Sequence, residues 1–146
     1  MNALKAAEDD LRRLDARSTG VIHLAERIST LESSLRSVKS SFKTGDRVSG
    51  GDRNHAEDKT IDAIMELSIA KRNYRIASHE VYQINEALDA LTDEERYVLQ
   101  CYYLSPIPDR VEHLCDEFNC GKSKVYALKD DALLRFALFR YGIVDL

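Results

Sequence analysis

The sequence predicts an all-α protein. Of its 146 residues, 44% are hydrophobic and 32% are charged, which is ordinary for a globular chain. Helix-favouring residues (Ala, Leu, Glu, Lys and Arg) are abundant, and the apolar–polar alternation that marks strands is absent. Apolar residues recur instead at steps of three and four. We therefore expect a long N-terminal helical hairpin or coiled coil, followed by a small C-terminal helical domain.

Composition also limits the class of protein. No apolar run approaches the ~20 residues needed to cross a bilayer, and the charged N-terminus lacks the apolar core of a signal peptide. Three cysteines without scaffold-like spacing fit a reducing cytoplasm. No nucleophile–base pair, metal cluster or cofactor loop has a spacing that supports catalysis, so we expect neither an enzyme nor a cofactor. The net charge of −4 does not favour nucleic-acid binding.

Residues 1–42 form the predicted N-terminal helical segment. Leucines at 4, 11 and 14 make one apolar set, and a second set with steps of four and three begins at Leu24. Ser18, Thr19 and Gly20 lie between the two sets and weaken a helix interior, which predicts a bend or break there.

Residues 43–55, KTGDRVSGGDRNH, hold three of the six glycines and no periodic apolar residue. This composition predicts an exposed loop. The order of its Gly, Ser and Lys residues does not match the phosphate-binding pattern G-x-x-x-x-G-K-[ST], so we do not expect a nucleotide site.

Residues 56–91 carry a heptad pattern and predict one long helix. Alternating steps of three and four place eight residues on one stripe, the kind of seam that a coiled coil buries: Leu67, Ala70, Tyr74, Ala77, Val81, Ile84, Leu88 and Leu91. A helix this long needs a partner. We expect residues 1–42 to be that partner in an antiparallel hairpin, and self-association of the seam into a dimer is compatible with the same pattern.

Residues 92–141 form the predicted C-terminal domain. Thr92 and Glu95 match a capping box that starts a helix running to about Leu104. Pro106 and Pro108 then end it, and Asp109 is placed to cap the next helix.

A helix-turn-helix pattern covers residues 111–130. The motif requires a small residue where its helices cross, a residue tolerant of positive φ in the turn, and apolar residues at five fixed positions. Asn119 falls at the turn, where asparagine is a common substitute for glycine. All seven constrained positions are met, by Leu114, Cys115, Phe118, Asn119, Cys120, Val125 and Leu128.

This frame also explains the stretch HLCDEFNCGKSKVYALK (residues 113–129), which resembles a metal or phosphate site at first sight. Cys115 and Cys120 fall on inward positions, where a thiol acts as a small hydrophobic group, and His113 falls on a more exposed one. The spacing C-x4-C is not a usual zinc pattern. Gly121 begins the second helix, with no strand or second glycine before it. We expect no metal.

The second helix is the predicted recognition helix, although a solvated helix face is the alternative. Lysine and serine in a first helical turn can bind phosphates or base edges. Arg135 and Arg140, further along, are candidates for backbone contacts. The predicted DNA-binding residues are Lys122, Ser123, Lys124, Tyr126 and Lys129.

Residues 90–138 resemble the fourth, promoter-reading region of bacterial sigma factors. Leu91-Thr92-x-x-Glu95-Arg96-x-Val98-Leu99 is similar to its opening "L-x-x-R-E-R-x-V-L", and residues 129–133 are similar to its "K-x-x-A-L" close. With the leading coiled coil, the chain resembles the ArpU/RinA-type late transcriptional regulators of phages. The resemblance implies an activator of late phage genes that binds double-stranded DNA in the cytoplasm of a bacterial host. We also expect a homodimer, with RNA polymerase as a candidate further partner.

The sequence departs from the sigma pattern in two respects. Gly121 replaces the serine that usually caps the recognition helix, and residues 93–146 contain ten acidic and seven basic side chains. Because phosphate contacts dominate affinity, a single copy should bind DNA weakly and dimerisation becomes important. Two alternatives remain open: a small terminase-type DNA-packaging subunit, and a module that binds RNA polymerase or a host factor without touching DNA.

Overall fold

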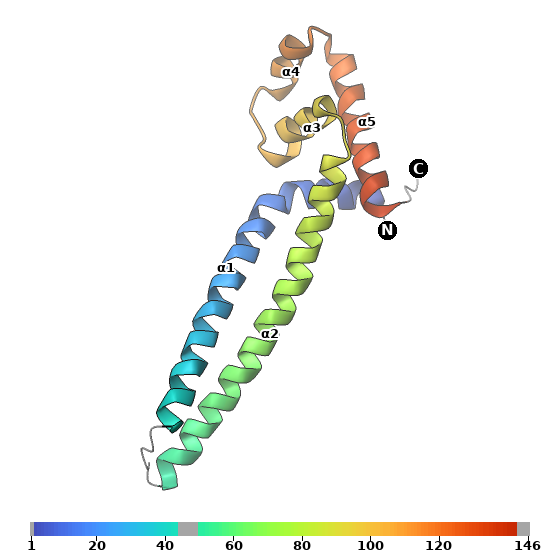
Figure 1. Ribbon diagram of the computed structural model, residues 1–146. Coiled ribbons are helices and arrows are strands. Elements are labelled where there is room, and N and C mark those ends of the chain that lie inside the picture. Colours follow the sequence, from blue (N-terminus) through green and yellow to red (C-terminus); the bar gives the residue numbers. More distant parts are fainter. Residues whose placement is uncertain (1, 44–49, 143–146) are drawn as a thin grey trace. The chain divides into compact units, whose positions relative to one another are not determined.

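A computed structural model describes residues 2–43 and 50–142, without the side chains of residues 39–43 and 50–56 (Figure 1). Every regular element in these ranges is helical, which confirms the predicted all-α class. None of the helices described is long and apolar enough to cross a membrane. The elements in chain order are α1 (Ala3–Lys43), α2 (Gly50–Asp89), α3 (Asp93–Leu99), the π-helical turn η1 (Gln100–Leu104), α4 (Arg110–Phe118) and α5 (Lys122–Tyr141).

Helix α1 is continuous, so of the predicted bend or break at Ser18–Gly20 the break does not occur, while the boundary between the two compact units of the chain falls there, between Ser18 and Thr19. The Ser18 hydroxyl donates a hydrogen bond to the carbonyl oxygen of Leu14, one turn earlier, at 2.8 Å. This back-bonding satisfies the serine within the helix instead of competing with it.

Helix α2 begins earlier than the sequence predicts. It starts at Gly50, so residues 50–55 are helical rather than part of the expected 43–55 loop. Residues 44–49 of that loop lie outside the described residues. Glycine is tolerated at the start of a helix, where it costs only about a few tenths of a kcal/mol relative to the best capping residues.

The chain divides into two compact units, residues 1–18 with 79–146 and residues 19–78. The second unit holds the adjoining parts of α1 and α2, which run antiparallel (Figure 1). Leu35 of α1 and Ala70 of α2 are its buried apolar residues. Two ion pairs join the helices, one between Arg27 and Glu66 and one between Glu32 and Lys71. The part of the predicted heptad seam that lies in this unit, from Leu67 to Ala77, therefore faces α1 of the same chain.

The first unit is built around a larger apolar core. The beginning of α1, the end of α2, the α3–η1 segment and the second half of α5 all contribute to it. Phe136, Ile84 and Leu99 are each completely buried. Its buried apolar residues are Ala7, Leu11, Leu14, Ile84, Ala87, Leu88, Leu91, Leu99, Tyr103, Ala132, Leu133, Phe136 and Ala137.

Local signals for the α3 start are confirmed. The Thr92 hydroxyl accepts a hydrogen bond from the Glu95 backbone N–H at 3.2 Å, and the Glu95 carboxylate accepts one from the Thr92 N–H. The predicted cap at Asp109 is wrong, because Asp109 precedes α4 without a side-chain hydrogen bond to it.

Candidate nucleic-acid interface

Helices α4 and α5 are joined by a short turn that reverses the chain direction. Asn119 ends α4 in the left-handed region, with φ 52° and ψ 50°, and is the only described non-glycine residue with positive φ. The backbone N–H groups of Asn119 and Cys120 both donate hydrogen bonds to the carbonyl oxygen of Cys115. The bond from Cys120 is 3.1 Å long. The predicted positive-φ turn residue is thus confirmed.

A second apolar cluster lies beneath this pair of helices. Leu114 and Val125 are completely buried in it. Val98 and Cys101 of the α3–η1 segment are the other buried members of the cluster. Of the other predicted core positions, Asn119 is exposed, while four are half-buried and pack against the cluster: Cys115, Phe118, Cys120 and Leu128.

The cysteines and the histidine of residues 113–120 serve packing. Cys115 and Cys120 are free thiols against the apolar cluster, though half-buried rather than fully buried. His113 is exposed, and its Nε2 is hydrogen-bonded to the Tyr97 hydroxyl at 2.6 Å. Cys101 is the buried thiol, and burial raises its pKa, which keeps it protonated at neutral pH.

The first turn of α5 is exposed. Gly121 is the N-cap residue and has no side chain to cap the helix, so its first backbone N–H groups receive no cap from the N-cap position. Lys122, Ser123 and Lys124 are all exposed. Over the part of the chain that the structure describes, neither lysine takes part in an ion pair.

The other two predicted DNA-contact residues of α5, Tyr126 and Lys129, differ in how accessible their side chains are. Tyr126 is 49% exposed. Lys129 is held within the fold, because its ammonium group lies 2.8 Å from the Asp130 carboxylate and 5.7 Å from the centre of the Tyr102 ring. The hydrogen bond to Asp130 raises the pKa of Lys129. Lys129 is therefore less available to a ligand than Lys122 and Lys124.

A shallow groove adjoins Tyr126. Arg110, at the start of α4, also lines it, and its guanidinium group lies 5.0 Å from the centre of the Tyr102 ring. Sequence reasoning did not select Arg110. The signal available was a cation directly before the predicted motif of residues 111–130, because the first helix of helix-turn-helix proteins crosses the DNA backbone.

The two arginines near the end of α5 are engaged in ion pairs. Arg135 lies 3.2 Å from the Glu95 carboxylate. Arg140 lies 3.4 Å from the buried carboxylate of Asp10, and only 14% of its side chain is exposed. The expectation that Arg140 contacts a nucleic-acid backbone is therefore wrong.

Comparisons with known proteins add no relative. No protein-family model matches the chain, and no significant match was found among curated proteins or solved structures.

Proposed function

We propose that this chain is a sequence-specific DNA-binding transcriptional regulator that acts as a dimer on promoter DNA. The resemblance of residues 90–138 to the promoter-reading region of sigma factors favours a phage or prophage late-gene activator of the ArpU/RinA type. The observation that carries the proposal is the turn at Asn119, which joins α4 to a helix whose first turn exposes Lys122, Ser123 and Lys124.

The chemistry of this first turn suits a phosphate-bearing ligand. Backbone N–H groups at a helix N-terminus carry partial positive charge, and those after Gly121 receive no cap from the N-cap position. Lys122 and Lys124 add two full charges that neutralise phosphates. Tyr126 continues the exposed side of α5 toward the groove that Arg110 lines, so Arg110 is a further candidate for a backbone contact.

The acidic surroundings predict that one copy binds DNA weakly. Exposed carboxylates occur on α4 and on α5, among them Glu112, Asp116, Glu117, Asp130 and Asp131. Like-charge repulsion between these groups and phosphates limits affinity, and a dimer that reads two half-sites compensates for it. The same carboxylates favour a second candidate function, a module that binds RNA polymerase or a host factor without DNA contact.

The test is a binding measurement on a defined duplex. Rounds of selection from a randomised DNA library would give the preferred site, and fluorescence anisotropy would then compare wild type with Lys122→Ala/Lys124→Ala. A matched control, Arg13→Ala/Lys59→Ala, removes the same charge at two exposed positions. We expect the first variant to bind at least about tenfold more weakly, and its salt dependence to be shallower by about 0.9 for each phosphate that it no longer neutralises.

Three outcomes separate the candidates. Equally weakened binding in both double variants would mean that net charge, not the first turn of α5, governs binding. No selected site at low salt, combined with retention of RNA polymerase on the immobilised chain, would favour the interaction module. A ring-shaped assembly in light scattering would favour the terminase-type packaging subunit.

A further inference from the structure

One face of α2 exposes a row of large aliphatic side chains. Ile61, Met65, Ile69 and Ile76 are 54%, 58%, 57% and 58% exposed. Their steps of four, four and seven residues place them on one stripe of a helix with 3.6 residues per turn. Exposed large apolar residues scattered singly need no explanation, but four of them on one stripe, interrupted only by Arg72, mark an interaction surface.

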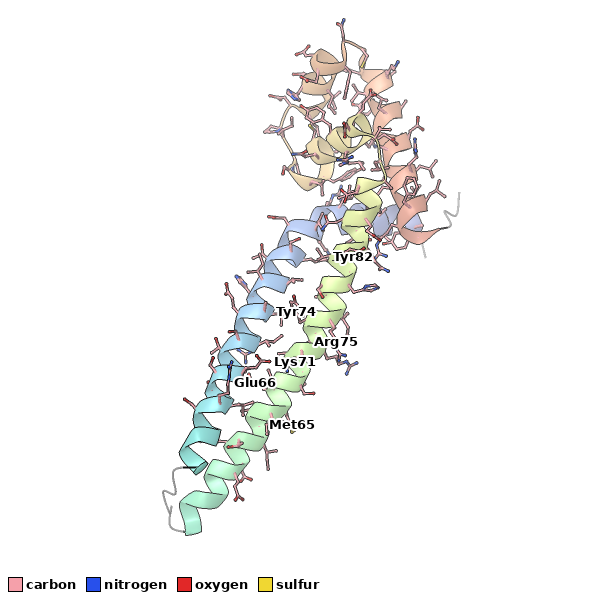
Figure 2. The ribbon with its side chains drawn as sticks, in the orientation of Figure 1. Met65, Glu66, Lys71, Tyr74, Arg75 and Tyr82 are labelled. Carbon is pink, nitrogen blue, oxygen red and sulfur yellow. The ribbon has the colours of Figure 1, made fainter. Side chains whose placement is uncertain are left out.

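This row lies on the side of α2 that is turned away from α1. Ala70, on the heptad seam, is 5% exposed, and at 100° per residue it is about 100° to 180° from the members of the row. Figure 2 shows Glu66 and Lys71 between the two helices, whereas Met65 lies on the side of α2 away from α1. Pairing within the hairpin therefore leaves the row uncovered.

The charges that border the row are separated by sign. Asp58 and Asp62 lie at the beginning of the row, and Arg72 and Arg75 lie near its end, all four exposed. A parallel copy would bring like charges together. An antiparallel copy centred near residues 68 and 69 puts Ile61 level with Ile76 of the second copy, and brings the acidic end of each row toward the basic end of the other. The charge pattern therefore favours antiparallel over parallel pairing.

We propose that this aliphatic row is a dimer interface, in which two copies of the chain pair antiparallel through the outer faces of α2. A two-fold axis near Ser68 and Ile69 makes each contact occur twice, as in any isologous interface. The paired rows extend over about 22 Å of helix, from residue 61 to residue 76. This inference identifies the surface through which the proposed regulator would dimerise. It depends on the proposed function only in expecting that two copies associate.

The first test measures self-association of the full chain by sedimentation equilibrium, without DNA. Ile69→Glu places a carboxylate at the centre of the interface in both copies, and we expect the dimer dissociation constant to rise at least about 100-fold. The matched control is Ile22→Glu, because Ile22 of α1 is 58% exposed and Ile69 is 57% exposed. Circular dichroism verifies that both variants remain helical.

A monomeric wild type, or an Ile69→Glu variant that dimerises as tightly as Ile22→Glu, would overturn the proposal. Neither result depends on DNA, so it would leave the proposed DNA contact of Lys122 and Lys124 intact. Conversely, a wild-type chain that forms this dimer but binds no DNA would contradict the proposed DNA-binding function and support the proposed dimer interface.

The second test addresses orientation through charge. Arg72→Glu/Arg75→Glu makes the face acidic along its whole length, so we expect about a tenfold weaker dimer. Adding Asp58→Lys/Asp62→Lys reverses the pattern completely and should restore the dimer. Added salt should weaken the wild-type dimer, because the pairing is between opposite charges. A wild-type dimer that tightens with salt would indicate like charges facing each other and would overturn the antiparallel arrangement.

Discussion

Replacing Asp10 with alanine should destabilise the first unit strongly. Asp10 is 5% exposed, the one buried charged residue described. Its carboxylate accepts a hydrogen bond from Arg17 at 2.9 Å and another from the Tyr141 hydroxyl, and Arg140 lies 3.4 Å away. One carboxylate therefore links the beginning of α1 to the end of α5.

The expected cost is about 3 kcal/mol in free energy of unfolding. Arg17 is 28% exposed and keeps a second acidic partner, Glu80, at 3.1 Å, so it contributes little to the destabilisation. Tyr141 loses the acceptor of its hydroxyl, and Arg140 loses its ion-pair partner while remaining largely covered. Leaving one member of a buried ion pair unpaired costs about 3 to 5 kcal/mol, and we take the lower value because water reaches part of this site.

The assay is urea unfolding followed by circular dichroism. Asp15→Ala is the matched control, because Asp15 is exposed in the same helix and the substitution makes the same change in helix propensity. We expect the control to alter the free energy of unfolding by less than about 0.5 kcal/mol. If Asp10→Ala and Asp15→Ala unfold at the same urea concentration, the carboxylate does not join the two helices as described and the reasoning fails.

Two further predictions concern single residues of α5 and the preceding turn. Burial, followed by the hydrogen bond to Asp10, raises the pKa of Tyr141 from 10.0 to about 12, so its stabilising effect is complete below pH 10 and disappears as pH rises to about 12. The unfolding free energy of Tyr141→Phe should accordingly fall less steeply than that of wild type over this interval, by about 1 to 2 kcal/mol after allowance for partial solvent access. Parallel curves would contradict the assignment. Asn119→Ala should cost about 1 kcal/mol in urea unfolding while Asn119→Gly costs almost nothing, because only glycine adopts positive φ without strain. Equal destabilisation by the two substitutions would mean that the Asn119 side chain, not its backbone conformation, matters.

Features that depend on neighbouring residues were predictable from the sequence. The Thr92–Glu95 capping box and the positive φ of Asn119 both follow from chemistry within a few residues. The periodic leucines likewise predict helices, because the period of burial follows the period of the backbone. Helix continuity was harder to predict, since Ser18 and Gly20 are weak breakers that a long hydrogen-bonded helix tolerates.

In the candidate site too, the sequence did not reveal contacts with residues from other helices. Periodicity placed Lys129 on the exposed side of α5, yet Tyr102 from η1 and the adjacent Asp130 hold it in the fold. The DNA contacts assigned to Lys122, Ser123 and Lys124 stay predictions, although the exposure that they require is present.

The sequence by itself determined the helical class, the turn between α4 and α5, and the apolar positions that this turn covers. Each of these follows from backbone geometry and from residues one or two turns apart. Only the tertiary structure decided the partners of the charges, because Asp10 and Tyr141 are 131 residues apart in the chain. It also decided that the α2 heptad seam from Leu67 to Ala77 faces α1 and leaves the Ile61–Ile76 row exposed, since a helix with two apolar faces can bury either one.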